Sequence, residues 1–388
     1  MIGIASMWQS LSLPETQLCL SAVLKCGQSF RWTVAGSPPN QEYRLCLRDR
    51  VVCLKQNPTT LFYRAVLPDP QPSAPQLAIR QAETLVWLND YFQLDVDLQK
   101  LYVEWAARDK VFSAIETRFA GIRILKQDPW ENLISFICSS NNNIGRITKM
   151  VQNLCSHYSP PLLSLADPSD PSVQVQYYPF PPPSVLAGQN VGSTLRNLNF
   201  GYRADFIQRT AKILVENHGD APEKFLASLR SVSTEDARVE LLKFVGVGRK
   251  VADCVLLMSL DKKEVVPVDT HVHQIAIKHY GLKGSLTSKA TMTPKLYEEI
   301  NSRLVAVWGD YAGWAHSVLF TSDLKAFSSY GISTPQKLAA AVLPIPPSTP
   351  SPRKRKSRTS DATEADPSPT ASLVDRVKRR RQDACLGR

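Results

Sequence analysis

One segment constrains this chain more than any other, the run LLKFVGVGRKVADC from Leu241 to Cys254. Its pattern is typical of one helix ending at a Gly-Val-Gly turn and a second helix that carries Lys250 near its start. Glycines allow a backbone to approach phosphate closely, and a helix N-terminus favours an anion. The pattern therefore predicts a helix-hairpin-helix at about residues 234–260 that holds a nucleic-acid backbone.

An acidic residue follows this hairpin in a second informative run. Asp269 stands nineteen residues after Lys250, within VVPVDTH. A deprotonated lysine amine is a nucleophile, and a carboxylate stabilises an electron-poor carbon. Taken alone, a lysine at a helix start more often meets solvent or phosphate, and an aspartate before Thr270 more often caps a helix. Taken together, the two residues predict a catalytic pair, and Asp269 can both cap and catalyse.

The charge of the chain favours a polyanionic partner without identifying it. The 388 residues contain 46 Lys+Arg and 35 Asp+Glu, a net charge of +11. Residues 341–388 hold 11 basic and 5 acidic residues (+6), so the other 340 residues hold 35 and 30 (+5). A mildly basic body with a strongly basic tail is compatible with nucleic-acid binding.

The apolar pattern divides the chain into three parts. Residues 1–118 are predicted to hold strands at 42–48, 51–54 and 61–67, followed by helices. Residues 119–330 are predicted to be helical, with a proline-rich loop at 159–188. Residues 331–388 are rich in Pro, Ser and Thr, contain basic clusters at 353–358 and 378–381, and are predicted to be a disordered tail. Helices are expected at 81–91, 98–107, 110–119, 129–139, 144–157, 203–218, 222–229, 234–242 and 311–325, and after Asp269 and Thr293.

With these features, the chain resembles the helix-hairpin-helix DNA glycosylases, and specifically the eukaryotic 8-oxoguanine DNA glycosylases. The resemblance covers roughly residues 10–328. Besides the hairpin, it rests on five segments in the right order: GQSFRW (27–32), YFQLD (91–95), SFICSSNNNI (135–144), GYR (201–203) and YAGWA (311–315). It implies an α+β fold, with an N-terminal antiparallel sheet like that of TATA-binding protein packed on a helical glycosylase domain.

The resemblance also implies a bifunctional enzyme of base excision repair. Such an enzyme flips 8-oxoguanine paired with cytosine out of double-stranded DNA, cuts its glycosidic bond and nicks the abasic strand. Lys250 would form a Schiff base with the sugar, and Asp269 would stabilise positive charge at C1′. Two alternatives stay open: a monofunctional glycosylase for another damaged base, and a non-catalytic module that binds damaged DNA.

The resemblance further implies which residues meet the flipped base and the DNA. The carbonyl of Gly27 would accept a hydrogen bond from N7–H, which 8-oxoguanine has and guanine lacks. Cys254 and Phe320 would lie on opposite faces of the base, although each alone would be read as core packing. The implied base pocket consists of Gly27, Cys254, Pro267, His316 and Phe320. The implied DNA contacts are Asn141, Arg146, Tyr202, Arg203, Gly246, Gly248 and His271.

Each DNA-contacting residue has an implied task. Asn141 would fill the gap beside the orphaned cytosine, Arg146 and Arg203 would read that base, and Tyr202 would wedge the stack. His271 would contact a phosphate. Without the resemblance, a helix C-cap, solvated side chains, a packed tyrosine and a structural histidine would be the simpler interpretations.

Three positions depart from the family pattern. His316 stands where glutamine is usual, at a position that touches the Watson–Crick edge of the base. Imidazole makes fewer simultaneous hydrogen bonds than an amide and adds a dependence on pH. Val245 replaces a proline before the hairpin. Arg249 replaces a small residue before the lysine, and is expected to lower the pKa of Lys250 or to contact phosphate.

No redox cofactor and no catalytic metal is expected, although the backbone carbonyls of the hairpin could hold a cation. An iron–sulfur glycosylase needs four closely spaced cysteines after the helical domain, and only Cys385 follows Asp269. The eight cysteines form no CxxC pair, which favours free thiols in a reducing compartment. The longest apolar runs are too short to cross a membrane. We expect a monomer that acts in the nucleus, with the mitochondrion as a second compartment.

Overall fold

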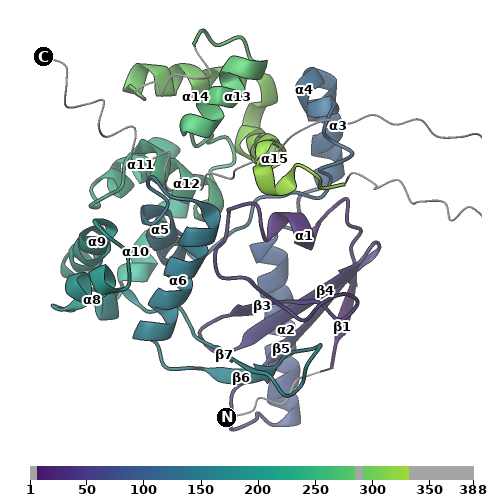
Figure 1. The fold of residues 1–388 in the computed structure, drawn as a ribbon, viewed down its shortest axis with the longest axis vertical. Helices are drawn as coiled ribbons and strands as arrows, with labels where there is room; N and C mark the ends of the chain where they lie inside the picture. The colour runs from purple at the N-terminus through teal and green to yellow at the C-terminus, as the bar shows by residue number, and fades with distance from the viewer. Residues whose placement is uncertain (1–6, 285–291, 332–388) are drawn as a thin grey trace, which may run out of the picture. The chain divides into compact units, whose positions relative to one another are not determined.

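The computed structural model describes residues 7–284 and 292–331, which form an antiparallel sheet and a larger group of helices (Figure 1). The strands are β1 (Gln9–Ser12), β2 (Thr33–Ala35), β3 (Glu42–Cys46), β4 (Val51–Asn57), β5 (Thr60–Val66), β6 (Leu163–Ala166) and β7 (Gln174–Tyr177). The helices are α1 (Leu20–Val23), α2 (Ala74–Tyr91), α3 (Leu98–Arg108), α4 (Lys110–Ser113), α5 (Pro129–Ile137), α6 (Ile144–Tyr158), α7 (Pro183–Leu186), α8 (Val191–Asn197), α9 (Arg203–His218), α10 (Pro222–Ser228), α11 (Thr234–Leu242), α12 (Arg249–Ser259), α13 (Thr270–His279), α14 (Pro294–Trp308) and α15 (Ala312–Asp323).

The five-stranded sheet is antiparallel throughout, in the order β1-β5-β4-β3-β2. Its three central strands were predicted from alternating side chains. Leu45, Val52 and Leu54 pack with Leu88 and Phe92 of α2 and its C-cap, because alternate residues of a strand point to the same face. The predicted antiparallel sheet is therefore confirmed, and β1 and β2 extend it at both edges.

The opposite face of the sheet is covered by a hairpin, β6–β7, that the sequence did not predict. Residues 159–188 were expected to be a loop because of their prolines, and that prediction was wrong. Leu163 and Leu165 alternate within the segment and pack against Cys53 of the sheet, while the prolines flank the strands. Arg44 is thereby buried, and it donates a hydrogen bond to the carbonyl of Ala166.

The helical part follows the sequence prediction closely. Helix α9 has the predicted bounds, and α6 extends one residue beyond them. Asp128, Asn143 and Ser233 each accept a backbone N–H bond at the start of α5, α6 and α11, as expected for N-caps. Helix α4 is shorter than predicted, since it ends at Ser113 instead of near residue 119.

A buried ion pair fastens the sheet part to the helices. Nη1 of Arg31 lies 2.8 Å from Oε2 of Glu131 in the first turn of α5. The same guanidinium donates to the carbonyls of Cys46, at the end of β3, and Tyr178, after β7. Burial raises the pKa of Glu131, and the charge of Arg31 opposes that shift. One side chain thus joins three segments that are distant in the sequence.

All of the described residues belong to one compact unit. The proposed domain boundaries at 118 and 330 stay predictions, and the predicted tail lies outside the described residues. The seven cysteines of the described ranges are free and buried. In those ranges, no helix has the length and apolar character that crossing a membrane requires.

Candidate active site and DNA-binding surface

The predicted helix-hairpin-helix is present as α11, a short turn and α12 (Figure 1). Gly246 in the turn has φ +80°, a conformation that side chains with a Cβ rarely adopt. A Cβ on Gly246 would also lie 2.4 Å from Cδ2 of Phe206 on α9. Gly248 is the N-cap of α12, and no atom lies within 4 Å of the position that its Cβ would take. The turn is therefore tightly packed at its first glycine and open at its second.

Lys250 and Asp269 both line the same two cavities, although they lie nineteen residues apart in the sequence. An inner pocket and an outer cavity are both lined by these two residues. Lys250 comes from the first turn of α12, and its Nζ donates a hydrogen bond of 3.2 Å to Oγ of Ser139. The same Nζ lies 4.9 Å from the ring centre of Phe136. Nζ of Lys250 is thus held between a hydroxyl group and an aromatic ring, and both neighbours belong to the segment around α5.

Asp269 caps helix α13, which confirms the simpler interpretation without excluding the chemical one. Its Oδ1 accepts the backbone N–H groups of His271 (2.9 Å) and Val272 (3.0 Å). These two bonds orient the carboxylate at the mouth of the inner pocket. A group so held needs little reorganisation when positive charge develops beside it.

The inner pocket contains all five residues that the resemblance placed around the base. Gly27, Cys254, Pro267, His316 and Phe320 line it, from segments spread over most of the described chain. The remaining lining residues were not identified from the sequence: Cys26, Gln28, Phe136, Met258, Val272 and Ser317. Two of them, Gln28 and Phe136, belong to segments that carry the resemblance, and this could have pointed to them.

Gly27 is held in place by the residue that follows it. Nε2 of Gln28 donates to the carbonyl of Arg123, and its Oε1 accepts the N–H of Leu125. Nε2 of Gln127 donates in turn to the carbonyl of Gln28. Gly27 has φ +90°, and a Cβ there would lie 2.9 Å from Cδ1 of Ile144. The backbone at Gly27 therefore forms a fixed wall of the pocket.

Two ionisable groups in this pocket are kept neutral by burial. Burial raises the pKa of the Cys254 thiol to about 11, against the opposing effect of the Lys250 charge. Burial lowers the pKa of His316 to about 4, and Asp269 opposes that shift while His271 and Lys250 add to it. Neither ring nitrogen of His316 has a hydrogen-bond partner, although the side chain is 6% exposed. The pocket therefore presents an unsatisfied neutral imidazole.

Four of the predicted DNA contacts gather where α6 and α9 begin. Arg203 donates to the carbonyls of Ser140 and Asn141, and Oη of Tyr202 donates to that of Ser140 at 3.1 Å. Asn141 is exposed and has φ +48°, as its place in an Asn-rich turn allows. Nη2 of Arg146 reaches the carbonyl of Asn199 at 3.4 Å. Asn141 also lines the outer cavity with Gly246 and Gly248.

His271 and Arg249, both expected to be free to contact phosphate, are paired with carboxylates of the protein. Nε2 of His271 is 3.1 Å from Oδ2 of Asp323, and its ring contacts Phe320 edge-on. Arg249 pairs with Asp253 and Glu298 at 3.2 Å each. Its guanidinium is therefore already neutralised within the protein. In residues 7–284 and 292–331, no three His, Cys, Asp or Glu side chains cluster as metal ligands would.

Comparison with known proteins identifies the family. A model of the N-terminal domain of 8-oxoguanine DNA glycosylase matches residues 10–133, and one of the HhH-GPD superfamily of base excision DNA repair proteins matches residues 134–301. The N-glycosylase/DNA lyase of Saccharomyces cerevisiae is 37% identical over 338 residues, which covers 81% of this chain and 85% of the yeast protein. The N-glycosylase/DNA lyase OGG1 of Arabidopsis thaliana is 36% identical over 321 residues, covering 82% and 81%.

A solved structure agrees with this assignment. MBOgg1 in complex with a low-affinity DNA ligand superposes with a TM-score of 0.65 at 26% identity, over 83% of this chain and 98% of that chain. The fold class is thus shared along with the sequence. The chain belongs to the 8-oxoguanine DNA glycosylase family of bifunctional N-glycosylase/DNA lyases within the helix-hairpin-helix superfamily.

Proposed function

We propose that this chain excises 8-oxoguanine paired with cytosine and then cleaves the abasic strand, with Lys250 as nucleophile and Asp269 as the charge-stabilising carboxylate. The observation that carries the proposal is the position of these two residues, which line both the inner pocket and the outer cavity. A base in the inner pocket and a backbone in the outer cavity would place the sugar between them.

The chemistry follows from that position. The bond between C1′ and the base breaks with its electron pair leaving on the base, and the Asp269 carboxylate stabilises the positive charge at C1′. The Lys250 amine then forms a bond to C1′, and opening of the sugar ring gives a Schiff base. Loss of a C2′ proton expels the 3′ phosphate, which cleaves the strand. No redox cofactor takes part in these steps.

Recognition of the base is assigned to the walls of the inner pocket. The carbonyl of Gly27 would accept N7–H of 8-oxoguanine, whereas N7 of guanine would face it as a second acceptor. The buried thiol of Cys254 and the ring of Phe320 would enclose the base. Pro267 would shape the pocket, and His316 would meet the Watson–Crick edge.

Recognition of the DNA is assigned to the surface around the outer cavity. Asn141 would occupy the gap left by the flipped base, while Arg146 and Arg203 would read the unpaired cytosine. Tyr202 is half exposed beside Asn141 and is suited to wedge the stack. Gly246 and Gly248 would meet phosphates through their backbone, and His271 would contact a phosphate after leaving Asp323.

The test is borohydride trapping on a duplex with one 8-oxoguanine opposite cytosine. Wild type is expected to form a covalent protein–DNA adduct, and Lys250→Gln to form none. Lys243→Gln is the matched control, because Lys243 is an exposed lysine of the same hairpin that pairs with Glu240. A wild type that releases base and leaves alkali-labile sites without an adduct is a monofunctional glycosylase. A wild type that binds but releases no base is a damaged-DNA-binding module.

We also propose that the chain acts as a monomer in the nucleus and, secondarily, in the mitochondrion. The basic clusters at 353–358 and 378–381 are the sequence feature behind the nuclear assignment. A fluorescent fusion of the full chain is expected to concentrate in the nucleus, and replacement of both clusters by Gln and Ser is expected to disperse it. Sedimentation of the full chain is expected to give the mass of one copy.

A further inference from the structure

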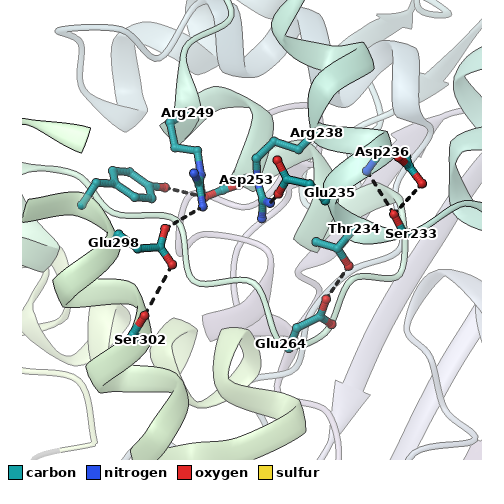
Figure 2. A network of polar contacts seen from close by, with 11 residues as sticks. Ser233, Thr234, Glu235, Asp236, Arg238, Arg249, Asp253, Glu264, Glu298 and Ser302 are labelled. Carbon is teal, nitrogen blue, oxygen red and sulfur yellow. Dashed lines mark hydrogen bonds and ion pairs between the residues drawn. The ribbon is translucent and has the colours of Figure 1, made fainter. Parts of the chain in front are cut away.

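The fully buried carboxylate of Asp253 lies on the same helix as the proposed nucleophile, Lys250. Asp253 is on α12, three residues after Lys250, and its side chain is 0% exposed. It accepts hydrogen bonds from Nε of Arg238 at 2.8 Å and from Nε of Arg249 at 3.2 Å. Figure 2 shows Asp253 between these two arginines. The mechanism proposed above gives this carboxylate no task.

A third hydrogen bond connects Asp253 to the segment that carries Asp269. Oη of Tyr297, on α14, donates to Oδ2 of Asp253 at 2.7 Å. The same oxygen accepts the backbone N–H of Val268 at 3.0 Å. Burial, reinforced by the charge of Asp253, raises the pKa of Tyr297 above its usual value, so the hydroxyl keeps the proton that it donates. Asp269 is the next residue after Val268.

This chain of bonds joins the two halves of the active site. Lys250 and Asp253 share helix α12, whereas Asp269 follows the segment 261–268, which has no helix or strand. Helix α14 bonds this segment a second time, since Nδ2 of Asn301 donates to the carbonyl of Val266 at 2.9 Å. The Tyr297 hydroxyl therefore links the helix that carries Lys250 to the segment that leads to Asp269.

We infer that Asp253 and Tyr297 are positioning residues. Through the hydrogen bond to the Val268 amide, they fix the position of Asp269 relative to Lys250. The inference rests on the charge-stabilising role proposed for Asp269. Misplacement of a catalytic group by about 1 Å costs on the order of 100-fold in rate. Loss of the Tyr297 hydroxyl is therefore expected to weaken the step that needs Asp269 more than the step that needs only Lys250.

The two steps are measured separately. Base release from an 8-oxoguanine duplex passes through an electron-poor C1′ and needs Asp269, while strand cleavage at a preformed abasic site starts from an aldehyde. In single-turnover experiments with saturating protein, Tyr297→Phe is expected to slow base release about 10- to 100-fold. The same variant is expected to slow cleavage at the abasic site less than about threefold.

Tyr280→Phe is a control for the structural effect of losing a tyrosine hydroxyl that donates to an aspartate, in this case from a half-buried side chain. Oη of Tyr280 donates to Oδ2 of Asp109 at 2.6 Å, in the same part of the fold but away from both cavities. Both variants are expected to lower the midpoint of thermal unfolding by similar amounts of about 2–4 °C. Only Tyr297→Phe is expected to separate base release from strand cleavage.

Asp269→Asn and the double variant complete the test. If Tyr297 acts through Asp269, then Tyr297→Phe adds no further loss of base release in the Asp269→Asn background. An equal slowing of both steps, a full additional loss in the double variant, or an effect matched by Tyr280→Phe would each overturn the inference. Undiminished base release by Asp269→Asn would instead overturn the role proposed for Asp269.

Discussion

The His316 side chain is a neutral imidazole in the part of the pocket assigned to the Watson–Crick edge. A glutamine amide, usual at this position, can donate and accept at once through two different atoms, and so can neutral imidazole. The substitution therefore keeps one donor and one acceptor but adds a group that titrates. Because the folded-state pKa is about 4, the ring stays neutral at physiological pH. His316 is accordingly compatible with base recognition by hydrogen bonds.

The depressed pKa of His316 predicts an effect on stability. The unfolded chain takes up a proton as pH falls through about 6.5, while the folded protein resists until about 4, so stability falls over this window. Between pH 7 and 5, wild type is expected to lose about 2 kcal/mol more unfolding free energy than His316→Gln. Urea denaturation at both pH values measures this. Parallel pH dependence of the two proteins would contradict the burial of the ring.

Asp269 has two tasks that substitutions can separate. Asparagine keeps an oxygen that can cap α13, so Asp269→Asn is expected to change the unfolding free energy by less than about 0.5 kcal/mol. Loss of the negative charge is expected to slow base release about 100-fold or more. Asp269→Ala is expected to show the same slowing and also to lose about 1 kcal/mol of stability. Equal stability of the Asn and Ala variants would show that the cap contributes nothing.

The hairpin element makes its own prediction at the two glycines. Gly246→Ala must place a Cβ against Phe206 in a backbone with positive φ, and is expected to cost about 2 kcal/mol or more. Gly248→Ala is its control, since φ is −92° there and the space is open, and is expected to cost less than about 1 kcal/mol. Chemical denaturation compares the two. An unchanged unfolding free energy for Gly246→Ala would mean that Phe206 on α9 can move away from the hairpin at little cost.

At the level of elements, helices and strands were predicted correctly where the nearby residues carry a clear pattern. The starts of α5, α6 and α11 agree with the predicted ranges, and Asp128, Asn143 and Ser233 accept backbone N–H bonds of the following turn there. The segment 159–188 was predicted to be a loop because it is rich in proline, although Leu163 and Leu165 alternate as they do in a strand. A strand of four residues has too few alternating side chains for its pattern to be recognised between several prolines.

At the scale of the whole molecule, the buried Arg31–Glu131 pair joins the sheet to α5. Arg31→Met leaves the buried carboxyl of Glu131 without its partner, and is expected to cost about 3–5 kcal/mol of unfolding free energy. Adding Glu131→Gln to that variant is expected to recover part of the loss. Glu240→Gln, which breaks the exposed pair with Lys243, is expected to cost less than about 1 kcal/mol. Similar losses for the buried and exposed pairs would contradict the tie between sheet and helices.

The sequence by itself determined the hairpin, the bounds of α6 and α9 to within one residue, the central strands and the family. These features follow from local periodicity, caps and glycines, or from motifs such as GQSFRW that carry the family resemblance. It also led to Lys250 and Asp269, because each lies in a distinctive run. Only the tertiary structure decided what surrounds them. Tyr297, Asp253 and Val268 are separated by up to 44 residues, and their side chains carry no pattern that marks them as partners. Their hydrogen bonds exist because packing brings α12, α14 and the segment 261–268 together, and burial forces each polar group to find a partner.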